Sequence, residues 1–361
     1  MLNENSETSI RNLMNNVYIL NNNPQKSGAG RYAEQLLSVT RNPSNFISAI
    51  WDSTKLPTEF QGFKLTRNPK IKVHPLVEIT GYGSRVFPQF FFKEYCRLVK
   101  KIKLIDGIIH YASQLVFPIF TNDRDIVTIL DLFALNMANE KINRFILKKY
   151  LNFSNILTIS KDTAKQIRLV LPNSKPVVIY PYASAAFHKI DKEEARRITG
   201  ITGDDKIILN VSSLQQRKNL EFIESVMKKL GSGYKLVRVG PKFGNEKNFE
   251  NVSDEFLNAI YNAADLFLFP TKNEGFGYPI VEAMSSGLPI VASDIPVVRE
   301  VTKDAAILKN PFSVDDFVNG IKETTNSPDD IIRKELDRAK YFTYSRFRNE
   351  LLNYYKSVGA K

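Results

Sequence analysis

Short apolar runs alternate with longer amphipathic stretches along most of the 361-residue chain. Apolar runs of about four to eight residues, bounded by glycine, proline or polar residues, are typical of strands buried in a parallel sheet. The amphipathic stretches between them are typical of helices that cover such a sheet. We therefore predict an α/β fold with strands at residues 17–20, 46–50, 71–73, 105–110, 126–131, 155–160, 177–180, 206–213, 234–240, 266–269 and 289–293.

This alternation restarts halfway along the chain. Residues 181–184 read as a linker, and the strand–helix pattern begins again after them. A chain of this length accommodates two domains of common size. We predict two Rossmann-like, doubly wound domains, residues 1–183 and 184–340, followed by a helix in residues 341–361 that carries an apolar stripe.

Residues 266–301 carry the most informative pattern: a strand, a glycine-containing loop, a helix and a second strand. Such a loop places backbone N–H groups and the positive end of a helix at the edge of a parallel sheet, where phosphate groups bind. Two carboxylates, Glu274 and Glu282, bracket the loop, and each can accept two hydrogen bonds from a vicinal diol of a sugar. Two glutamates alone would favour an ordinary solvated helix beside a turn. The Gly-Phe-Gly-Tyr-Pro sequence between them favours sugar binding.

The segment E-G-F-G-Y-P-I-V-E-A-M-S-S-G-L-P-I-V-A-S-D, residues 274–294, resembles the E-x7-E motif of retaining GT-B glycosyltransferases of family 4 (glycosyl transferases group 1). This resemblance implies two domains that face each other across a cleft. Residues 1–183 would form the acceptor side and residues 184–340 the nucleotide-sugar donor side, with the C-terminal helix crossing back to the first domain. It also implies donor-binding roles for Glu274 with the hexose, Glu282 with the ribose, and the loop residues Gly275, Phe276, Gly277 and Tyr278 with the sugar and phosphates.

Two adjacent cations follow the first strand of the second half. Arg217 and Lys218 would lie at the carboxyl edge of the sheet, where they could neutralise a diphosphate or simply form an exposed basic turn. The sequence V-S-S-L-Q-Q-R-K-N resembles the family segment V-G-x-x-x-x-R-K-N and implies phosphate binding, with Ser212 in place of the usual glycine. The resemblance also places Gly240 and residues 252–253 beside the nucleobase.

A second glycine pair follows the strand at residues 17–20. Gly28 and Gly30 are predicted to lie in a loop that precedes a helix with Ala33, Leu36 and Leu37 on its apolar face. A Gly-x-Gly pattern alone is compatible with a plain tight turn. The family has a similar Gly-x-Gly-Arg-Tyr loop, which implies that Gly28 and Gly30, together with Arg31, face the donor phosphates and the acceptor.

The segment I-V-T-I-L-D-L resembles the family segment T-x-H-D-L, but Leu130 stands where a histidine is usual. This departure leaves Asp131 as the polar group at the end of that strand and as a candidate catalytic residue. His110, at the end of another strand, is a candidate substitute for the missing histidine. The alternative is that His110 is simply a histidine whose hydrogen bonds are satisfied at a strand end.

The positive charge of the chain is concentrated in its first half. Residues 1–183 hold 24 Lys and Arg against 13 Asp and Glu, whereas residues 184–361 hold 26 against 25. An excess of this kind indicates an anionic partner. Residues 86–103 could form a basic amphipathic helix that lies on an anionic membrane, or a helix that packs on its own sheet.

With one cysteine, the chain cannot form a disulfide framework. Its three histidines are scattered along the sequence, so we expect neither a resident metal nor a cofactor. The N-terminus is polar and acidic, and no apolar run approaches the roughly eighteen residues of a membrane span. We expect a cytoplasmic protein, and the membrane alternative would place it on the inner face of the membrane.

The expected function is transfer of a mannose- or glucose-type hexose from a UDP- or GDP-linked donor to an acceptor hydroxyl. The resemblance implies retention of anomeric configuration without a metal, catalytic roles for Asp131, Arg217, Lys218 and Glu274, and a carbohydrate or lipid-linked acceptor. A catalytically silent nucleotide-sugar-binding scaffold is the first alternative. A basic nucleic-acid-binding protein is the second, although the sequence contains no recognisable groove-reading helix.

Overall fold

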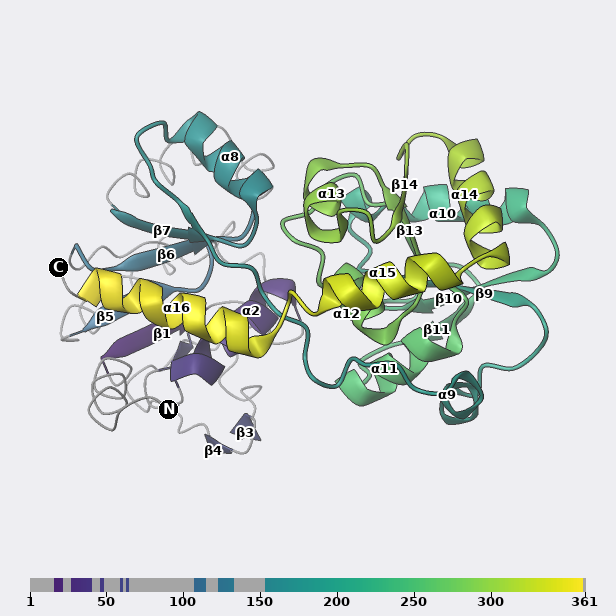
Figure 1. The fold of residues 1–361 in the computed structure, drawn as a ribbon, viewed down its shortest axis with the longest axis horizontal. Helices are drawn as coiled ribbons and strands as arrows, with labels where there is room; N and C mark the ends of the chain where they lie inside the picture. Colours follow the sequence, from purple (N-terminus) through teal and green to yellow (C-terminus); the bar gives the residue numbers. More distant parts are fainter. Residues whose placement is uncertain are drawn as a thin grey trace, which may run out of the picture. The chain divides into compact units, whose positions relative to one another are not determined.

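The computed structural model of the chain describes residues 16–21, 27–40, 107–114, 123–132 and 153–359, and the backbone of residues 46–48, 59–60 and 63–64. It divides into two compact units (Figure 1). The first comprises residues 1–159, 163–179 and 348–361, and the second residues 160–162 and 180–347. The predicted strand at residues 71–73 and the basic helix at residues 86–103 lie outside the described residues.

The first unit contains a six-stranded sheet in the order β2-β1-β5-β6-β7-β8. Every pairing in it is parallel. A separate antiparallel hairpin joins two further short strands. The strands are β1 (Val17–Asn21), β2 (Phe46–Ser48), the hairpin pair β3 (Glu59–Phe60) and β4 (Phe63–Lys64), β5 (Ile108–Tyr111), β6 (Ile126–Ile129), β7 (Asn155–Thr158) and β8 (Val177–Val178).

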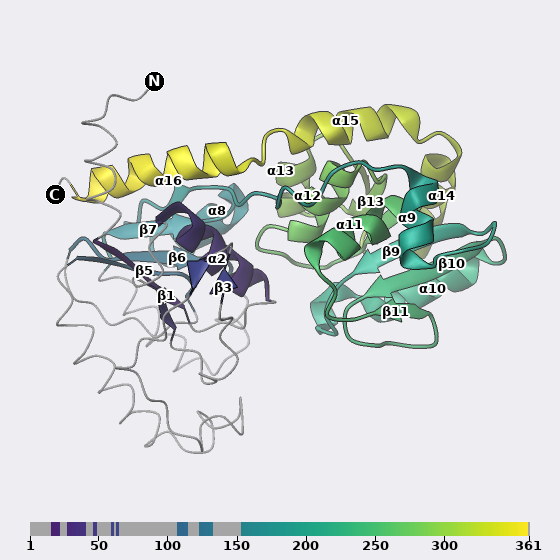
Figure 2. The ribbon, with the colours of Figure 1, turned by 90° about the horizontal axis from the view of Figure 1, so that it is seen from below.

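Helices of this unit come from both ends of the chain, as Figure 2 shows. Side chains from two of them are linked by a buried chain of hydrogen bonds through Thr128 and His110. Tyr32 bonds to Thr128 Oγ1 at 3.3 Å, and His110 Nε2 lies 2.7 Å from the same oxygen. His110 Nδ1 in turn lies 2.7 Å from the hydroxyl of Tyr355. The helices are α2 (Gly28–Thr40), most of α8 (Lys161–Val170) and most of α16 (Tyr344–Gly359).

The second unit contains a parallel six-stranded sheet in the order β11-β10-β9-β12-β13-β14. Its first strand in the sequence, β9, lies between β10 and β12, so the winding direction reverses there. Both edge strands are short, and neither contains the apolar run that identified the others. The strands are β9 (Lys206–Val211), β10 (Tyr234–Val239), β11 (Lys247–Phe249), β12 (Leu266–Phe269), β13 (Ile290–Ser293) and β14 (Ile307–Lys309).

Helices cover both faces of this sheet (Figures 1 and 2). Helices α10 and α14 pack together on one face, and α9, α11, α12 and α15 form a connected layer on the other. The helices are α9 (Lys192–Thr199), the 3₁₀ helix η2 (Gln216–Lys218), α10 (Leu220–Leu230), α11 (Asp254–Ala263), α12 (Tyr278–Ser286), α13 (Pro296–Thr302), α14 (Val314–Asn326) and α15 (Asp329–Ala339).

Successive side chains of the central strand β12 point to opposite faces of the sheet and so contribute to both layers of the core. Leu266 and Leu268 belong to the cluster that includes Ile223 of α10 and Phe317 of α14. Phe267 points to the other face, where its ring lies 5.7 Å from that of Tyr261 on α11. All four residues of β12 are buried, as expected for a central strand of a doubly wound sheet.

The structure confirms each predicted strand that falls within its described residues, with ends that differ by no more than three residues. No helix among the described residues is both long enough and apolar enough to span a bilayer.

Candidate functional site

The carboxyl ends of β9 and β12 lie side by side at the point where the winding of the second sheet reverses. In open α/β sheets, ligands bind at this position, because the loops from the two strands diverge to opposite faces and leave a crevice. The loop after β9 carries Arg217 and Lys218, and the loop after β12 carries Glu274. The topology therefore brings together residues that are 56 positions apart in the sequence.

Backbone contacts hold these two loops against each other. The carbonyl oxygen of Arg217 accepts hydrogen bonds from the Lys272 N–H at 2.8 Å and from the Thr271 hydroxyl at 3.1 Å. Asn219 ends η2 in the left-handed conformation, with φ 62°, which asparagine tolerates better than most residues. Its side-chain amide donates to the Pro270 carbonyl at 3.2 Å. The cations are thus presented by a loop that is fastened to the end of β12.

Glu274 forms ion pairs with both cations. One carboxylate oxygen lies 2.8 Å from Arg217 Nη1, and the other contacts Lys218 Nζ. The Thr271 hydroxyl oxygen lies 3.2 Å from the same carboxylate. Burial alone would raise the pKa of Glu274, but the charges of Lys218 and Arg217 outweigh burial and hold its pKa below the ordinary value. The three side chains form a partly buried cluster with a net charge of about +1, which suits an anionic ligand.

The glycine loop after Glu274 leads directly into α12. Gly277 caps this helix with φ 97°, in the left-handed region that favours glycine. Phe276 is buried and packs against the rings of Tyr278, Phe342 and Tyr180, with centroid distances of 5.5, 5.7 and 6.3 Å. These contacts fix the loop that the sequence identified as donor-binding.

Glu282 lies one turn into α12 and is 2% exposed. Its carboxylate accepts a hydrogen bond from the Tyr261 hydroxyl at 2.9 Å. Pro279 lies in the first turn of the helix, where its missing N–H costs no hydrogen bond. Tyr261, which orients the carboxylate, was not identified from the sequence, because nothing in the apolar pattern of α11 distinguishes it from a core residue.

The backbone of Gly240 packs closely against the residue that follows β9, Ser212. A Cβ atom at this position would lie 2.1 Å from the carbonyl oxygen of Ser212, and its φ of +137° is one that other residues rarely adopt. The close approach therefore requires glycine. Ser253, in the segment assigned to the nucleobase, caps α11 by accepting from the Phe256 N–H at 3.2 Å.

Arg238 is a buried cation that the sequence analysis did not single out. Its side chain is fully buried beneath the Ser212–Gly240 contact. It donates to the Ser212 carbonyl at 3.2 Å and to the Pro241 carbonyl at 3.0 Å, and it lies 3.6 Å from Glu246. It therefore ties the loop after β9 to the loop after β10. An arginine between two valines, Val237 and Val239, is the signal that could have identified it.

The prediction that Gly28 and Gly30 lie in a loop is wrong. Both belong to the first turn of α2, which begins at Gly28. Ser27 provides the physical reason, because its hydroxyl accepts from the Gly30 N–H at 3.0 Å and its carbonyl from the Arg31 N–H at 2.9 Å, as in a helix N-cap. Gly30 is buried and Gly28 is exposed. Both still lie at a helix N-terminus after β1.

At the end of β6, Asp131 accepts a hydrogen bond from the Gln114 side-chain amide at 3.1 Å. The same amide group, through its oxygen, accepts from the Leu130 N–H at 2.9 Å. Gln114 thus orients Asp131 from the neighbouring strand end and was missed from the sequence. The Leu130 side chain is 6% exposed and packs in the core.

His110 has the second of the two roles considered for it. The ring is fully buried, and both of its nitrogens have hydrogen-bond partners, Tyr355 and Thr128. Burial lowers the pKa of His110 to about 3, so the ring stays neutral. A neutral histidine held inside the sheet does not replace the polar group that Leu130 removes.

Within the described residues, no three His, Cys, Asp or Glu side chains gather as a metal site would require. The comparisons with known proteins address the site as a whole. Residues 191–343 match the family of glycosyl transferases group 1, and this range includes Arg217, Lys218, Glu274 and Glu282.

This part of the chain is a glycosyl transferases group 1 domain. The chain is 35% identical over 128 residues to O-antigen chain mannosyltransferase B of Escherichia coli, an alignment that covers 34% of this chain and 33% of that protein. It is 38% identical over 90 residues to the O-antigen chain mannosyltransferase RfbU of Salmonella typhimurium, covering 25% and 26%. The chain thus spans a third or less of the length of these curated relatives.

The likeness in fold extends over nearly the whole chain. The structure of Anabaena HepE in complex with UDP and glucose superposes with a TM-score of 0.77 at 15% identity, covering 94% of this chain and 99% of that one. At this level of identity the likeness concerns the fold. It confirms the predicted GT-B fold with two Rossmann-like units, and residues 191–343 match the predicted family.

Proposed function

We propose that this group 1 glycosyltransferase moves a mannose- or glucose-type hexose from a nucleotide diphosphate sugar to an acceptor hydroxyl, with retention and without a metal. The observation that carries this proposal is the cluster of Glu274 with Arg217 and Lys218 at the reversal point of the second sheet. The names of the relatives, mannosyltransferases in two cases and a UDP- and glucose-bound protein in the third, support the same class of substrate.

The electrostatics of the cluster suit a departing diphosphate. When the bond between the anomeric carbon and the diphosphate oxygen breaks, negative charge accumulates on the leaving group. Arg217 offers a planar fork of donors and Lys218 a compact charge, and both are already oriented by Glu274. These two cations would stabilise the leaving group in the role that a metal plays in other sites.

The two glutamates would bind hydroxyls rather than attack the sugar. Glu274 is ionised at neutral pH, since its pKa is lowered, and would accept from a hexose hydroxyl. Glu282, oriented by Tyr261, would accept from the ribose. The acceptor oxygen then forms its bond to the anomeric carbon on the face from which the diphosphate departs. The acceptor proton passes to the departing phosphate oxygen, so the configuration is retained.

The first unit would supply the acceptor side. Asp131, held by Gln114 at the end of β6, is the candidate polar group there, and Gly28 and Gly30 provide the N-terminus of α2 after β1. The acceptor in this proposal is a carbohydrate or a lipid-linked carbohydrate.

Donor turnover by three variants tests the proposal. Glu274→Ala should abolish hexose transfer or donor hydrolysis with UDP- and GDP-sugars while it keeps nucleotide binding. Glu282→Ala should mainly weaken nucleotide binding. Glu323→Ala, which removes an exposed carboxylate on α14, is the matched control and should behave like the parent.

Transfer at the parental rate by both site variants would refute the assignment. Donor binding by the parent without any transfer or hydrolysis would instead favour a catalytically silent nucleotide-sugar-binding scaffold. Leu130, in place of the usual histidine, is the feature that supports this alternative.

A further inference from the structure

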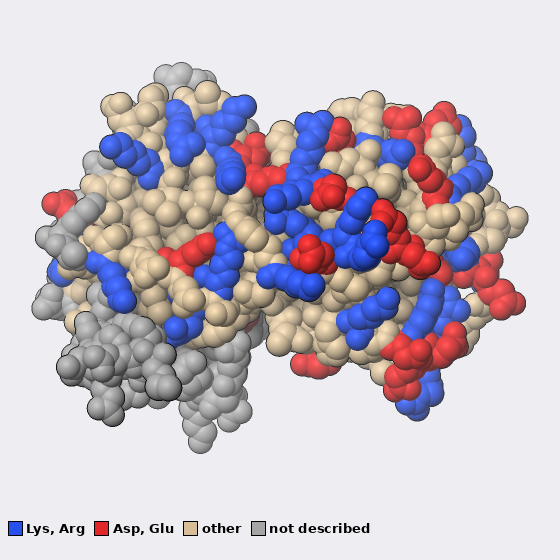
Figure 3. Space-filling view, viewed as in Figure 1, with Lys and Arg blue, Asp and Glu red and all other residues tan. Residues whose placement is uncertain are grey.

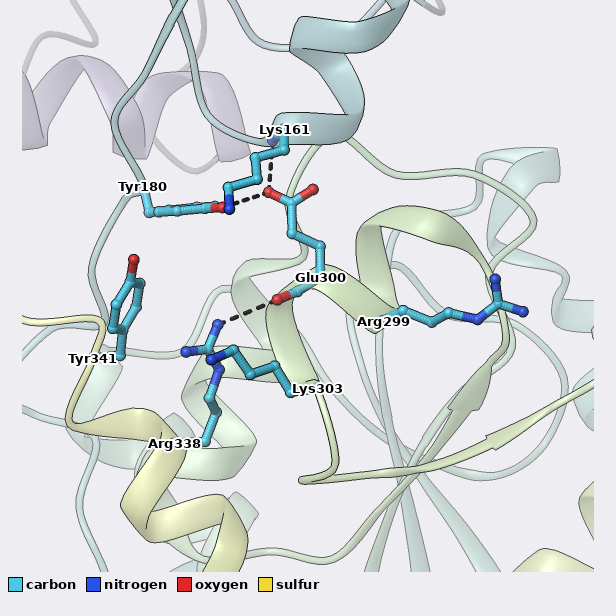
Figure 4. Close-up of a pocket in the computed structure, with 7 residues that line it drawn as sticks. All are labelled: Lys161, Tyr180, Arg299, Glu300, Lys303, Arg338 and Tyr341. Carbon is cyan, nitrogen blue, oxygen red and sulfur yellow. Dashed lines mark hydrogen bonds between the residues drawn. The ribbon is translucent and has the colours of Figure 1, made fainter.

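A basic pocket of about 400 Å³ lies in the second unit and shares no residue with the proposed donor site. Figure 4 shows the side chains that line it. Basic side chains also gather over α13 and α15 in the space-filling view, with a few acidic ones among them (Figure 3). The pocket is lined by Lys161, Tyr180, Arg299, Glu300, Lys303, Arg338 and Tyr341.

The only carboxylate among these lining residues already accepts three hydrogen bonds. Glu300 accepts from the N–H groups of Lys161 and Asp162 at 2.6 and 2.9 Å. The Tyr180 hydroxyl donates to it at 2.7 Å, and burial together with this contact raises the pKa of Tyr180, so the hydroxyl keeps its proton. Glu300 therefore forms part of the wall, where three hydrogen-bond donors stabilise its charge.

The four cations of the pocket differ in their surroundings. Arg299 pairs with Asp294 at 2.6 Å and extends away from the other lining residues in Figure 4. Among the ion pairs formed between described residues, none involves Lys303 or Arg338. The pocket thus presents the three cations Lys161, Lys303 and Arg338 against one hydrogen-bonded carboxylate.

Arg338 is held rigidly at the pocket. Its Nε donates to the Val301 carbonyl at 2.8 Å, and its Nη2 donates to the Glu300 carbonyl at 3.2 Å. Its guanidinium lies 4.6 Å from the ring centroid of Tyr341 and 4.8 Å from that of Phe342. A guanidinium that is fixed on one side and faces a cavity on the other is preorganised to bind an anion.

Lys303 adopts a backbone conformation that lysine normally avoids. It ends α13 with φ 55° and ψ −114°. The other two non-glycine residues with positive φ in the described part of the chain are asparagines, Asn219 and Asn251, which tolerate this region. A glycine would adopt the conformation without strain. Strain of this kind is typical of functional positions, so the lysine side chain itself is the feature to explain.

We propose that this pocket binds a phosphate group, with Lys161, Lys303 and Arg338 as its ligands. A phosphate has several acceptor oxygens and up to two negative charges, and converging cations on rigid and extended side chains match it. Tyr180 and Tyr341 provide a wall against which an organic remainder of a phosphate ester can lie. The phosphate can be free in solution, part of a soluble ester, or the headgroup of a lipid.

Calorimetric titration with inorganic phosphate and with pyrophosphate tests the proposal. Lys303→Ala should raise Kd about tenfold, since a charge-assisted hydrogen bond is lost. Lys303→Gly should raise Kd equally and yet unfold at a temperature equal to or above that of the parent, because glycine relieves the strain. Lys340→Ala removes an exposed lysine next to Tyr341 that pairs with Asp337, and it should leave Kd unchanged.

Arg217→Ala separates this pocket from the donor site. If only Arg217→Ala lowers the affinity for phosphate, or if both Lys303 variants bind phosphate like the parent, the proposal is overturned. A vesicle arm identifies the source of the phosphate. Phosphatidylcholine vesicles with phosphatidic acid, compared with phosphatidylcholine alone, should retain the parent more than Lys303→Ala if the group belongs to a lipid. If the vesicles retain the parent and Lys303→Ala equally, while Lys303→Ala binds soluble phosphate more weakly, the pocket binds a soluble phosphate.

Discussion

Replacement of Glu274 by glutamine would test the electrostatics of the donor site in the absence of any substrate. Glutamine keeps the shape of the side chain and removes its charge, so Arg217 and Lys218 lose their shared counter-charge. The Glu274 and Lys218 side chains are only 8% and 11% exposed. The like charges of the two cations then remain close together in a poorly hydrated place.

The expected cost follows from this burial. Removal of one partner from a buried ion pair costs about 3–5 kcal/mol. The Arg217 side chain is 28% exposed, which screens its share, and glutamine can still accept a hydrogen bond from Lys218. We therefore expect the low end of the range, about 3 kcal/mol, which corresponds to a fall of about 6–12 °C in Tm for a unit of this size.

A diphosphate should reverse part of this loss. Its negative charges can replace the missing carboxylate, and no carboxylate competes for the cations in Glu274→Gln. Nucleoside diphosphate affinity should therefore rise by about tenfold, or about 1.4 kcal/mol, while sugar transfer falls. The assay is thermal unfolding of the parent and the variant, with and without UDP and GDP, followed by calorimetric titration.

The pH dependence has a defined sign. Because the pKa of Glu274 is lowered in the folded state, its stabilising contribution is complete above its ordinary pKa of 4.5 and is lost as pH falls through the lower folded value. The difference in Tm between parent and variant should therefore be constant at neutral pH and close in acid. A variant that matches the parent in Tm at neutral pH, and in affinity for both nucleotides, would refute the reasoning.

Two further predictions concern the second unit. Glu335 is fully buried, and one of its oxygens accepts from the Ile290 N–H at 2.9 Å. Burial raises the pKa of Glu335 well above the ordinary value. Its contribution to stability should therefore fall as pH rises from about 4.5 through the folded pKa, by up to about 1.4 kcal/mol per pH unit. Urea unfolding of the parent and Glu335→Gln over this pH range should show that decline in the parent only, and parallel profiles would contradict it. Gly240→Ala should lower Tm and nucleotide affinity together, because its Cβ would lie 2.1 Å from the Ser212 carbonyl oxygen. Gly231→Ala is the control, since Gly231 also has a positive φ but no atom lies near the added Cβ, and this variant should affect Tm alone.

Most of the described strands could be predicted from the sequence, because a strand buried on both faces of a parallel sheet must be continuously apolar. The edge strands β11 and β14 escaped prediction, since three residues such as Lys247–Phe249 bury too little to leave a pattern. Gly28 and Gly30 were assigned to a loop from the pattern of a strand, a glycine loop and a helix, whereas the cap formed by Ser27 lets the helix begin at Gly28.

The contacts within the candidate site could not be predicted from the sequence pattern. Arg217, Lys218 and Glu274 were each identified from their local motifs, but their mutual ion pairs depend on β9 and β12 being neighbours. Supporting residues such as Gln114, Arg238 and Thr271 carry no motif, and they become recognisable only through the groups that they contact. A sequence pattern identifies side chains that act on a ligand more readily than those that hold these side chains in place.

The most direct test of the central claim is calorimetric titration of the chain with UDP and with GDP. We predict that at least one of them binds and that Arg217→Ala raises its Kd by about tenfold or more. Arg333→Ala, which removes an exposed arginine on α15, should leave Kd unchanged. Binding of neither nucleotide to the parent, or equal affinity for parent and Arg217→Ala, would contradict the claim that the loops after β9 and β12 hold the diphosphate of a sugar donor.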